Sequence, residues 1–257
     1  MTSQVVGVGS GRPLVLLHGW GMNSAVWSSI LPQLTESYRV TLLELPGHGA
    51  EPYAEACDQL DDWVAHCLQR APRNADWIGW SLGGQIALRA ALLEPERIRR
   101  LVMVCASPRF VRAADWPAAM PEATLRQFAE SLQQDHQQTL ARFLALQVQG
   151  DDQAREALRL LRQEVKQRPS PQPAALEAGL ELLLSIDLRA HLELLSVPSL
   201  WLLGARDALV PRALAGALHS LQIPAAEVEL IAGCAHAPLL SHRAQSMALI
   251  RPFLERE

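Results

Sequence analysis

Residues 75–84 read ADWIGWSLGG. An apolar run stops at Ser81, and glycine stands at positions 79, 83 and 84. The stretch 79–83 fits the pattern G-x-S-x-G, and it follows a predicted strand and precedes a predicted helix. In that context the pattern predicts a nucleophile elbow, a tight turn that lifts the serine hydroxyl to the carboxyl edge of a sheet. Glycine is expected on both sides of the serine because side chains two positions away would clash in so tight a turn.

The rest of the chain alternates short aliphatic runs with amphipathic helical patterns. The predicted strands cover residues 4–8, 14–17, 39–45, 76–80, 98–105, 199–203 and 227–231. The predicted helices cover residues 25–35, 58–70, 82–93, 211–221 and 242–254. Most strand runs are continuously apolar, as in strands that are covered on both faces. The alternation predicts an α/β fold with a mostly parallel central sheet flanked by helices.

Residues 109–187 break this alternation. They contain three or four helical patterns, no convincing strand and a proline-rich patch at 168–173. We interpret 109–187 as a helical cap, or lid, inserted between two strands of the sheet. Residues 1–108 and 188–257 then form the core domain.

Composition limits the classes of function. The 257 residues include 23 basic and 27 acidic side chains, and a net charge of −4 gives no basic field that would suggest nucleic acid. The N-terminus has no signal-peptide pattern, and the chain has no span of about 18 apolar residues. We expect a cytoplasmic monomer that binds no membrane. The four cysteines lack C-x-x-C spacing and are expected to be buried free thiols; with no metal-ligand spacing visible, we expect no metal and no cofactor.

A serine hydroxyl becomes a good nucleophile only when a base takes its proton and an acid orients that base. In folds with this elbow the chain order is serine, acid, histidine. Asp207 comes just after one predicted strand, and His236 lies in the loop after the next, so both reach the same sheet edge as Ser81. We predict that these three residues form a catalytic triad. His242 and Asp187 remain the alternatives for the base and the acid.

Hydrolysis through a tetrahedral intermediate also needs donors for the oxyanion. The N–H of Leu82 follows the serine directly. The loop 16–21, with sequence LLHGWG, follows an early predicted strand and places Trp20 to give a second N–H. We predict that Trp20 and Leu82 form the oxyanion hole.

Five segments together resemble known enzymes: LVLLHGWGMNSAVW (14–27), WIGWSLGGQIAL (77–88), RFLALQ (142–147), DALVP (207–211) and AHAP (235–238). They resemble the α/β-hydrolase superfamily and, more narrowly, the BioH family of pimeloyl-[acyl-carrier protein] methyl ester esterases of biotin biosynthesis. The resemblance runs from about residue 13 to the C-terminus, cap included. It implies the α/β-hydrolase fold and a serine carboxylesterase that converts pimeloyl-acyl-carrier-protein methyl ester to pimeloyl-acyl-carrier protein and methanol. A general short-chain carboxylesterase, or a non-catalytic ligand-binding protein of this fold, remains an alternative.

The same resemblance implies which residues line the substrate site. They are Trp20, Ser81, Leu82, Phe143, Leu144, Ala145, Leu146, Gln147 and His236. One departure from the superfamily pattern lies nearby, because Glu44 stands where an aspartate is usual. We expect this change to affect at most the loop near the pocket.

A basic stripe in the cap predicts a partner. Arg155, Arg159, Arg162 and Lys166 are spaced 4, 3 and 4 residues apart, which places them on one face of a helix. Stacked cations repel one another, and an acidic partner would relieve the repulsion and be steered in. The resemblance implies that this partner is acyl carrier protein, and Arg142 could extend the patch. The alternative is a solvated helix face balanced by acidic residues, namely Asp151, Asp152, Glu156 and Glu164.

Overall fold

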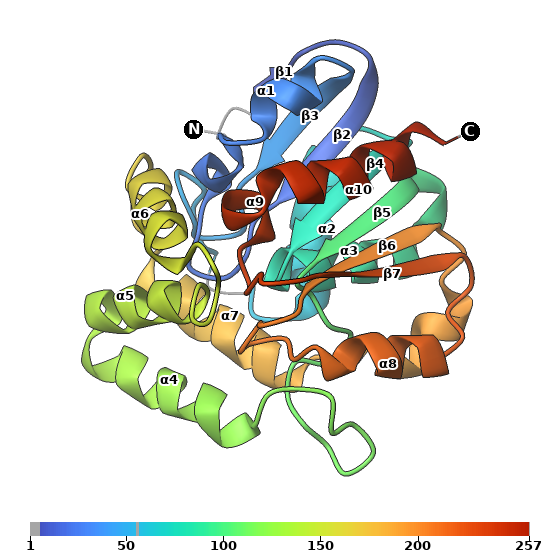
Figure 1. Cartoon of the computed structure of the whole chain (residues 1–257). Helices are drawn as coiled ribbons and strands as arrows, with labels where there is room; N and C mark the ends of the chain where they lie inside the picture. The colour runs from blue at the N-terminus through green and yellow to red at the C-terminus, as the bar shows by residue number, and fades with distance from the viewer. Residues whose placement is uncertain (1–5, 55–56, 257) are drawn as a thin grey trace.

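The computed structural model describes residues 6–54 and 57–256 (Figure 1). The strands are β1 (Val6–Val8), β2 (Arg12–Leu17), β3 (Tyr38–Leu43), β4 (Ala75–Trp80), β5 (Ile98–Val104), β6 (Ser199–Gly204) and β7 (Ala226–Ile231). Within the described residues they form one seven-stranded sheet in the order β1-β3-β2-β4-β5-β6-β7. β1 is antiparallel to β3, and the other neighbouring strands are parallel. The predicted α/β fold is confirmed; the first two residues of the predicted strand 4–8 lie outside the described residues.

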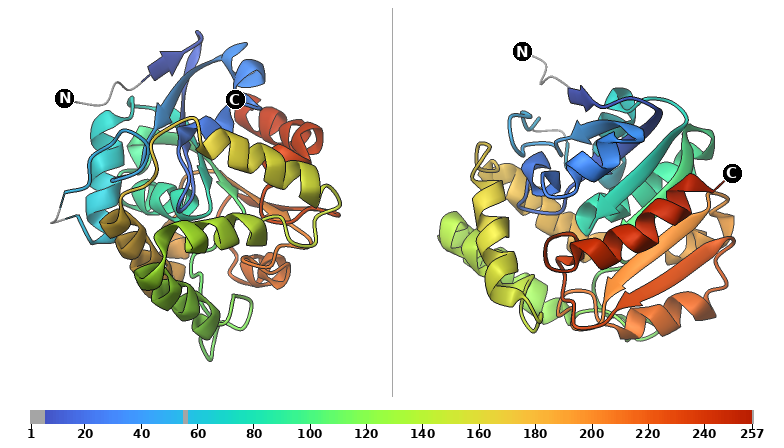
Figure 2. Two further views of the ribbon diagram at one scale, coloured as in Figure 1. Left: turned by 90° about the vertical axis from the view of Figure 1, so that its left-hand side faces the viewer. Right: turned by 45° about the horizontal axis from the view of Figure 1, so that its top comes forward.

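Helices cover both faces of the sheet (Figures 1 and 2). One face packs against α2 (Leu60–Arg70), α3 (Leu82–Leu93) and α8 (Ala213–Ser220). The other face packs against α1 (Leu31–Thr35) and α10 (Arg243–Glu255). Short helical turns complete the core: η1 (Ser24–Trp27), η2 (Pro95–Arg97), η3 (Arg189–Leu194) and α9 (Pro238–Ser241). None of the described helices is long and apolar enough to cross a membrane.

The central strands send alternate side chains into two separate cores. Every residue of β4 is buried, with Trp77 in the core under α2 and α3 and Ile78 in the core under α10. Val15 and Leu16 of β2 divide in the same way. Strands buried on both faces need apolar residues at every position, which explains their continuous aliphatic runs.

The helix predicted over residues 25–35 is two elements, η1 and α1. Asn23 caps η1 by accepting a hydrogen bond from the N–H of Ala25 at 3.1 Å. Pro32 then falls in the first turn of α1. Because proline has no N–H and its ring clashes with the carbonyl four residues earlier, one continuous helix cannot pass through this position.

Four helices lie between β5 and β6, in the segment predicted as a cap. They are α4 (Glu122–Gln134), α5 (His136–Leu146), α6 (Ala154–Val165) and α7 (Pro173–Ser185). Figure 1 shows them gathered at one side of the sheet. Two hydrogen bonds tie them to the loop after β2: Trp20 Nε1 donates to the Leu176 carbonyl at 2.8 Å, and Asn23 Nδ2 donates to the Val165 carbonyl at 2.8 Å.

The strand order decides where a site can form. β2 lies between β3 and β4, so the chain changes direction across the sheet at this point. Leu17 at the end of β2 pairs with Gly79 near the end of β4. The loops after these two strands are therefore neighbours at the carboxyl edge, where open parallel sheets bind ligands.

Candidate active site

Ser81 lies between the end of β4 and the first residue of α3. Its φ of +56° is in the left-handed region that residues other than glycine rarely adopt, a kind of strain that is frequent at active sites. A Cβ on Gly79 would lie 2.5 Å from the Gly83 carbonyl oxygen, so Gly79 lets the turn close on itself as predicted. A Cβ on Gly83 would lie 2.4 Å from the His18 carbonyl oxygen. Gly83 is thus needed for the approach of the loop after β2, which the sequence does not reveal.

His236 and Asp207 form a buried hydrogen-bonded pair. Nδ1 of His236 and Oδ2 of Asp207 are 2.6 Å apart, and neither side chain has exposed surface. The other carboxylate oxygen accepts from the N–H groups of Leu209 at 2.8 Å and Val210 at 2.9 Å. These bonds fix the carboxylate, so it can orient the imidazole and stabilise its charged form.

The loop that carries His236 folds back from the edge strand β7 toward β4. Trp80 Nε1 donates to the His236 carbonyl oxygen at 2.8 Å, next to Ser81. The loop crosses the end of β6 so closely that a Cβ on Gly204 would lie 2.0 Å from the Ala235 carbonyl oxygen. Within the described residues His236 Nε2 is buried and has no hydrogen-bond partner, so it is not bonded to Ser81 here. Catalytic hydrogen bonds are often long until substrate binds.

The alternative base and acid belong to other polar clusters. Asp187 is paired with two arginines, and the hydrogen bond from Arg189 is the main cause that lowers its pKa to about 2. His242 Nδ1 is hydrogen-bonded to the Ser241 hydroxyl at 2.8 Å. The structure therefore joins Asp207, rather than Asp187, to the predicted base.

The backbone after β2 passes directly beside Ser81. A Cβ on Gly19 would lie 3.1 Å from the Ser81 Cβ, which brings the following peptide, that of Trp20, to the serine. The Trp20 indole is fully buried. Leu82 is the first residue of α3, where an N–H has no acceptor within the helix. The structure thus brings both residues predicted to form the oxyanion hole next to Ser81.

Two residues at the end of α5 reach the site from the insertion. Phe143 packs edge-on against Trp20, with ring centroids 4.7 Å apart. The carbonyl oxygen of Gln147 accepts from the His236 N–H at 2.9 Å. The side-chain amide of Gln147 is buried and, among the described residues, has no hydrogen-bond partner.

The residues between them have different surroundings. Leu144 packs into the core cluster on the α10 side of the sheet. Ala145 and Leu146 line an open groove, and Leu146 also packs against the core cluster that contains Trp20 and Phe143. Because successive residues on a helix point about 100° apart, consecutive positions cannot all face one pocket.

A buried polar layer behind the loop after β2 was missed by the sequence analysis, apart from the departure at Glu44. Glu44 accepts from Ser24 N–H at 2.9 Å and Ser24 Oγ at 2.6 Å, and its Oε2 lies 3.1 Å from His18 Nε2. Burial alone would raise the pKa of Glu44, but the hydrogen bonds from His18 and Ser24 outweigh it and lower the pKa to about 2. His48 Nε2 accepts from the Gly21 N–H at 3.3 Å, and burial above all lowers the pKa of His48 to about 3. The layer thus supports the loop that carries the predicted oxyanion donor.

Among the described residues, two clusters have the composition of metal ligands: Cys105 with Asp207 and His236, and Cys234 with Asp151 and His242. Hydrogen bonds hold the members of each cluster: His236 Nδ1 pairs with Asp207, Cys105 Sγ donates to the Ala235 carbonyl, and Cys234 Sγ contacts the Ser241 hydroxyl. Burial is the main cause that raises the pKa of both thiols well above the usual range. We interpret both groups as hydrogen-bonded clusters.

The predicted docking cations belong to α5, to α6 and to the residue directly after α6, and these two helices face the viewer in Figure 2 (left). All five are exposed: Arg142, Arg155, Arg159, Arg162 and Lys166. Arg142 and Arg155 line the same open groove. Among the described residues, the stripe forms one ion pair, between Arg159 and Glu156 at 2.6 Å. Two acids expected to balance it, Asp151 and Glu164, are buried instead.

Comparison with known proteins agrees with this architecture. Residues 12–243 match the family described as alpha/beta hydrolase fold. A pimeloyl-[acyl-carrier protein] methyl ester esterase of Photobacterium profundum is 42% identical over 247 residues, 96% of each chain. A protein of the same name from Nitrosomonas europaea is 44% identical over 235 residues, 91% of this chain and 92% of that one.

Solved structures show the same fold at lower sequence identity. An esterase from Exiguobacterium antarcticum superposes with a TM-score of 0.87, covers 98% of this chain and 95% of its own, and is 21% identical. The relatives that match nearly the full chain show which family within the superfamily the chain belongs to. The chain therefore belongs to the α/β-hydrolase superfamily and, within it, to the family of pimeloyl-[acyl-carrier protein] methyl ester esterases.

Proposed function

We propose that this protein is a serine carboxylesterase that hydrolyses the methyl ester of pimeloyl-acyl-carrier-protein methyl ester in biotin biosynthesis. The products are pimeloyl-acyl-carrier protein and methanol. The observation that carries the proposal is 42–44% identity, over 90–99% of this chain, to proteins named for that reaction. The buried His236–Asp207 pair beside the Ser81 elbow supplies chemistry that suits an ester.

In the first half of the proposed reaction, Ser81 Oγ attacks the ester carbonyl while His236 Nε2 takes the hydroxyl proton. Asp207 stabilises the imidazolium that forms. The backbone N–H groups of Trp20 and Leu82 bind the oxyanion, where removal of one such donor typically slows an enzyme 10²–10³-fold. The imidazolium then protonates the departing methoxide, and methanol leaves an acyl-enzyme on Ser81.

In the second half, His236 takes a proton from water, which attacks the acyl-enzyme carbonyl. The same oxyanion donors stabilise the second tetrahedral intermediate. Its collapse returns the proton to Ser81 and releases the pimeloyl carboxylate, still joined to the carrier through its other end. The overall reaction consumes one water and releases one methanol.

We further propose that residues 109–187 act as a cap over the reacting atoms. Ser81 is 2% exposed and His236 is fully buried, so little of the reacting pair faces bulk solvent. Phe143 and Trp20 offer an apolar wall for the acyl chain. The free amide of Gln147 can donate a hydrogen bond to, or accept one from, a polar group of the substrate.

The exposed cations of α5 and α6 are proposed to dock the carrier protein. Arg142 and Arg155 flank one groove, and Arg162 and Lys166 continue the stripe along α6. In the solvated-face alternative, acids lie beside the stripe on the surface; Asp151 and Glu164 are buried, and Glu156 pairs with Arg159 alone. Unbalanced positive charge steers an acidic partner and speeds its association.

The decisive comparison is kcat/KM for carrier-linked pimeloyl methyl ester against kcat/KM for a small free methyl ester such as methyl butyrate, which has the same leaving group. We expect the carrier-linked substrate to be preferred by at least about tenfold, since docking adds binding energy that the small ester lacks. Equal values would instead indicate a general short-chain carboxylesterase. Ser81→Ala should abolish both activities.

A further inference from the structure

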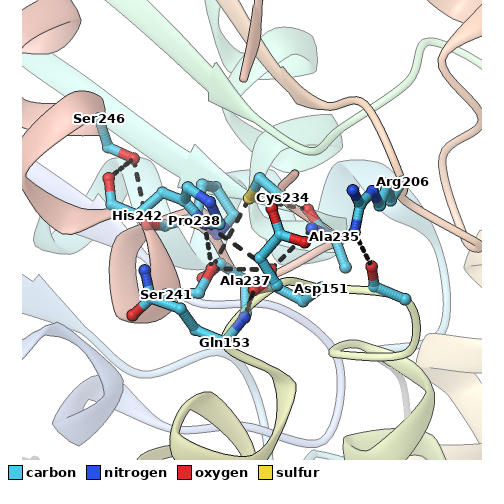
Figure 3. Close-up of polar contacts among 12 residues, drawn as sticks. Asp151, Gln153, Arg206, Cys234, Ala235, Ala237, Pro238, Ser241, His242 and Ser246 are labelled. Atoms are coloured by element: carbon cyan, nitrogen blue, oxygen red, sulfur yellow. Dashed lines mark hydrogen bonds and ion pairs between the residues drawn. The ribbon is translucent and has the colours of Figure 1, made fainter. Parts of the chain in front are cut away.

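A buried carboxylate from the insertion holds the loop that carries His236 (Figure 3). Asp151 lies in the connection between α5 and α6, and its side chain has no exposed surface. Its Oδ2 accepts from the Ala235 N–H at 2.8 Å and from the Ser241 hydroxyl at 2.8 Å. Ala235 directly precedes His236, and Ser241 follows it at the end of α9. One carboxylate oxygen therefore accepts hydrogen bonds from residues on both sides of His236 in the sequence.

Backbone hydrogen bonds run between the same two segments. The N–H of His236 donates to the Gln147 carbonyl at 2.9 Å, and the N–H of Asp152 donates to the Gly233 carbonyl at 2.9 Å. Backbone hydrogen bonds thus hold residues 147–152 against the loop that carries His236. Asp151 supplies the side-chain contacts of this junction.

The local chemistry favours strong bonds to this carboxylate. Its second oxygen accepts from the Gln153 N–H at 2.8 Å, so three donors converge on the group. Hydrogen bonds to an ionised acceptor in a buried site are stronger than neutral ones. Ser241 also contacts the Cys234 thiol and His242 Nδ1, which restrains its hydroxyl from another side (Figure 3).

We propose that Asp151 is a positioning residue for the base His236. The inference rests on the proposed function only in taking Ser81 as nucleophile and His236 as base. Nε2 of His236 has no hydrogen-bond partner among the described residues, so the orientation of the imidazole depends on Asp207 and on the backbone of its loop. Asp151 touches no reacting atom and acts by fixing that backbone.

The test compares variants in hydrolysis of p-nitrophenyl butyrate and in the rate at which a fluorophosphonate labels Ser81. Asp151→Ala removes the acceptor for both flanks. It should lower kcat about 10–100-fold, the range expected when a reacting group moves by about 1 Å or less, and should change KM less than about twofold. The labelling rate should fall by a similar factor. Asp151→Asn keeps one oxygen for Ala235 and Ser241 and loses only the bond from the Gln153 N–H, which does not belong to the histidine loop, so it should restore kcat to within about fivefold of the wild type.

Asp152→Ala is the matched control, because this neighbouring carboxylate is about half exposed and pairs with Arg206 on the surface. Its kcat should stay within about twofold of the wild type, as is usual for surface charges. All rates are measured well below the melting temperature of each variant. A folded Asp151→Ala with wild-type kcat and labelling rate would overturn the proposal. So would equal losses in Asp151→Ala and Asp152→Ala, or a failure of Asp151→Asn to restore kcat.

Loss of the buried acceptor in Asp151→Ala can also prevent folding, and Ser241→Ala then decides the question. It removes one of the two flanking bonds and should lower kcat and the labelling rate about threefold to tenfold together, with KM unchanged. Wild-type values in Ser241→Ala would overturn the proposal. The small ester keeps this inference separate from the proposed substrate. A wild type active on that ester but not on carrier-linked ester refutes only the substrate, whereas inactivity on both refutes the two together.

Discussion

A methyl group at position 179 would press on Trp20, one of the two residues proposed to form the oxyanion hole. Gly179 is buried in the middle of α7, and a Cβ there would lie 2.6 Å from Trp20 Cδ1 and 3.5 Å from Leu82 Cδ2. Carbon atoms pack at about 3.5–4.0 Å, so Gly179→Ala requires a shift of about 1 Å. Trp20 cannot yield freely because its Nε1 bonds to Leu176 and its ring packs against Phe143.

Two opposing effects set the stability of Gly179→Ala. Overpacking of this size destabilises by about 1–3 kcal/mol, and the better helix propensity of alanine returns about 1 kcal/mol. Gly216, in the middle of α8, provides the control, because no heavy atom lies within 4 Å of a Cβ built there. Gly216→Ala should stabilise by about 1 kcal/mol. The difference between the two variants therefore isolates the clash at about 1–3 kcal/mol.

Urea unfolding followed by circular dichroism gives both free energies of unfolding, and p-nitrophenyl butyrate hydrolysis gives kcat. Gly179→Ala should lower kcat about 10–100-fold, because a shift of about 1 Å in Trp20 moves its N–H away from the oxyanion. Gly216→Ala should keep the wild-type kcat. If Gly179→Ala gained as much stability as Gly216→Ala and kept kcat, then α7 would not support the oxyanion loop as described.

Three further predictions follow from the site and its surroundings. Asp207→Asn should lower kcat by about 10⁴-fold while the protein stays folded, since an amide favours the wrong tautomer of His236, and a rate within tenfold of the wild type would contradict the pairing. The contribution of His48 to the free energy of unfolding should fall by about 2 kcal/mol between pH 7 and pH 5. Burial holds the pKa of His48 near 3 in the folded protein, whereas in the unfolded chain the imidazole binds a proton below about pH 6.5. The stability that depends on neutral His48 is therefore present above about pH 6.5 and is lost as the pH falls. Urea titrations of wild type and His48→Gln at both pH values check this, and equal losses in the two proteins would refute it. Reversing Arg155 and Arg162 to glutamate should lower kcat/KM for carrier-linked ester about tenfold or more at low salt and leave kcat/KM for the small ester unchanged; equal losses on both substrates would argue against docking.

The sheet was predictable, and so was the placement of Ser81, Asp207 and His236 after strands, because both depend on local signals. Continuous aliphatic runs marked the strands, and parallel strands place the loops that follow them at one edge. Asp207 and His236 each follow a strand, and the structure joins them in one buried pair. The turn at Ser81 was predictable from its glycines, because a Cβ on Gly79 would clash with Gly83 of the same turn.

Contacts between distant segments were not predictable from local signals. The Asp151–Ala235 bond joins residues 84 positions apart, and the sequence suggested only a surface acid at Asp151. Likewise Gly83 is required by the approach of His18, and nothing near Gly83 in the sequence records that contact. The resemblance assigned the whole stretch 143–147 to the pocket without regard to helical geometry, which turns Leu144 into the core on the α10 side.

The identity of the nucleophile can be tested directly by intact-mass and peptide mass spectrometry after reaction with a fluorophosphonate. The proposal predicts one adduct per chain, located on Ser81, and loss of that adduct in Ser81→Ala. It also predicts labelling slowed by several orders of magnitude in His236→Ala, because the hydroxyl then has no base. An adduct on another residue, or labelling of Ser81 at an unchanged rate without the His236 imidazole, would contradict the mechanism.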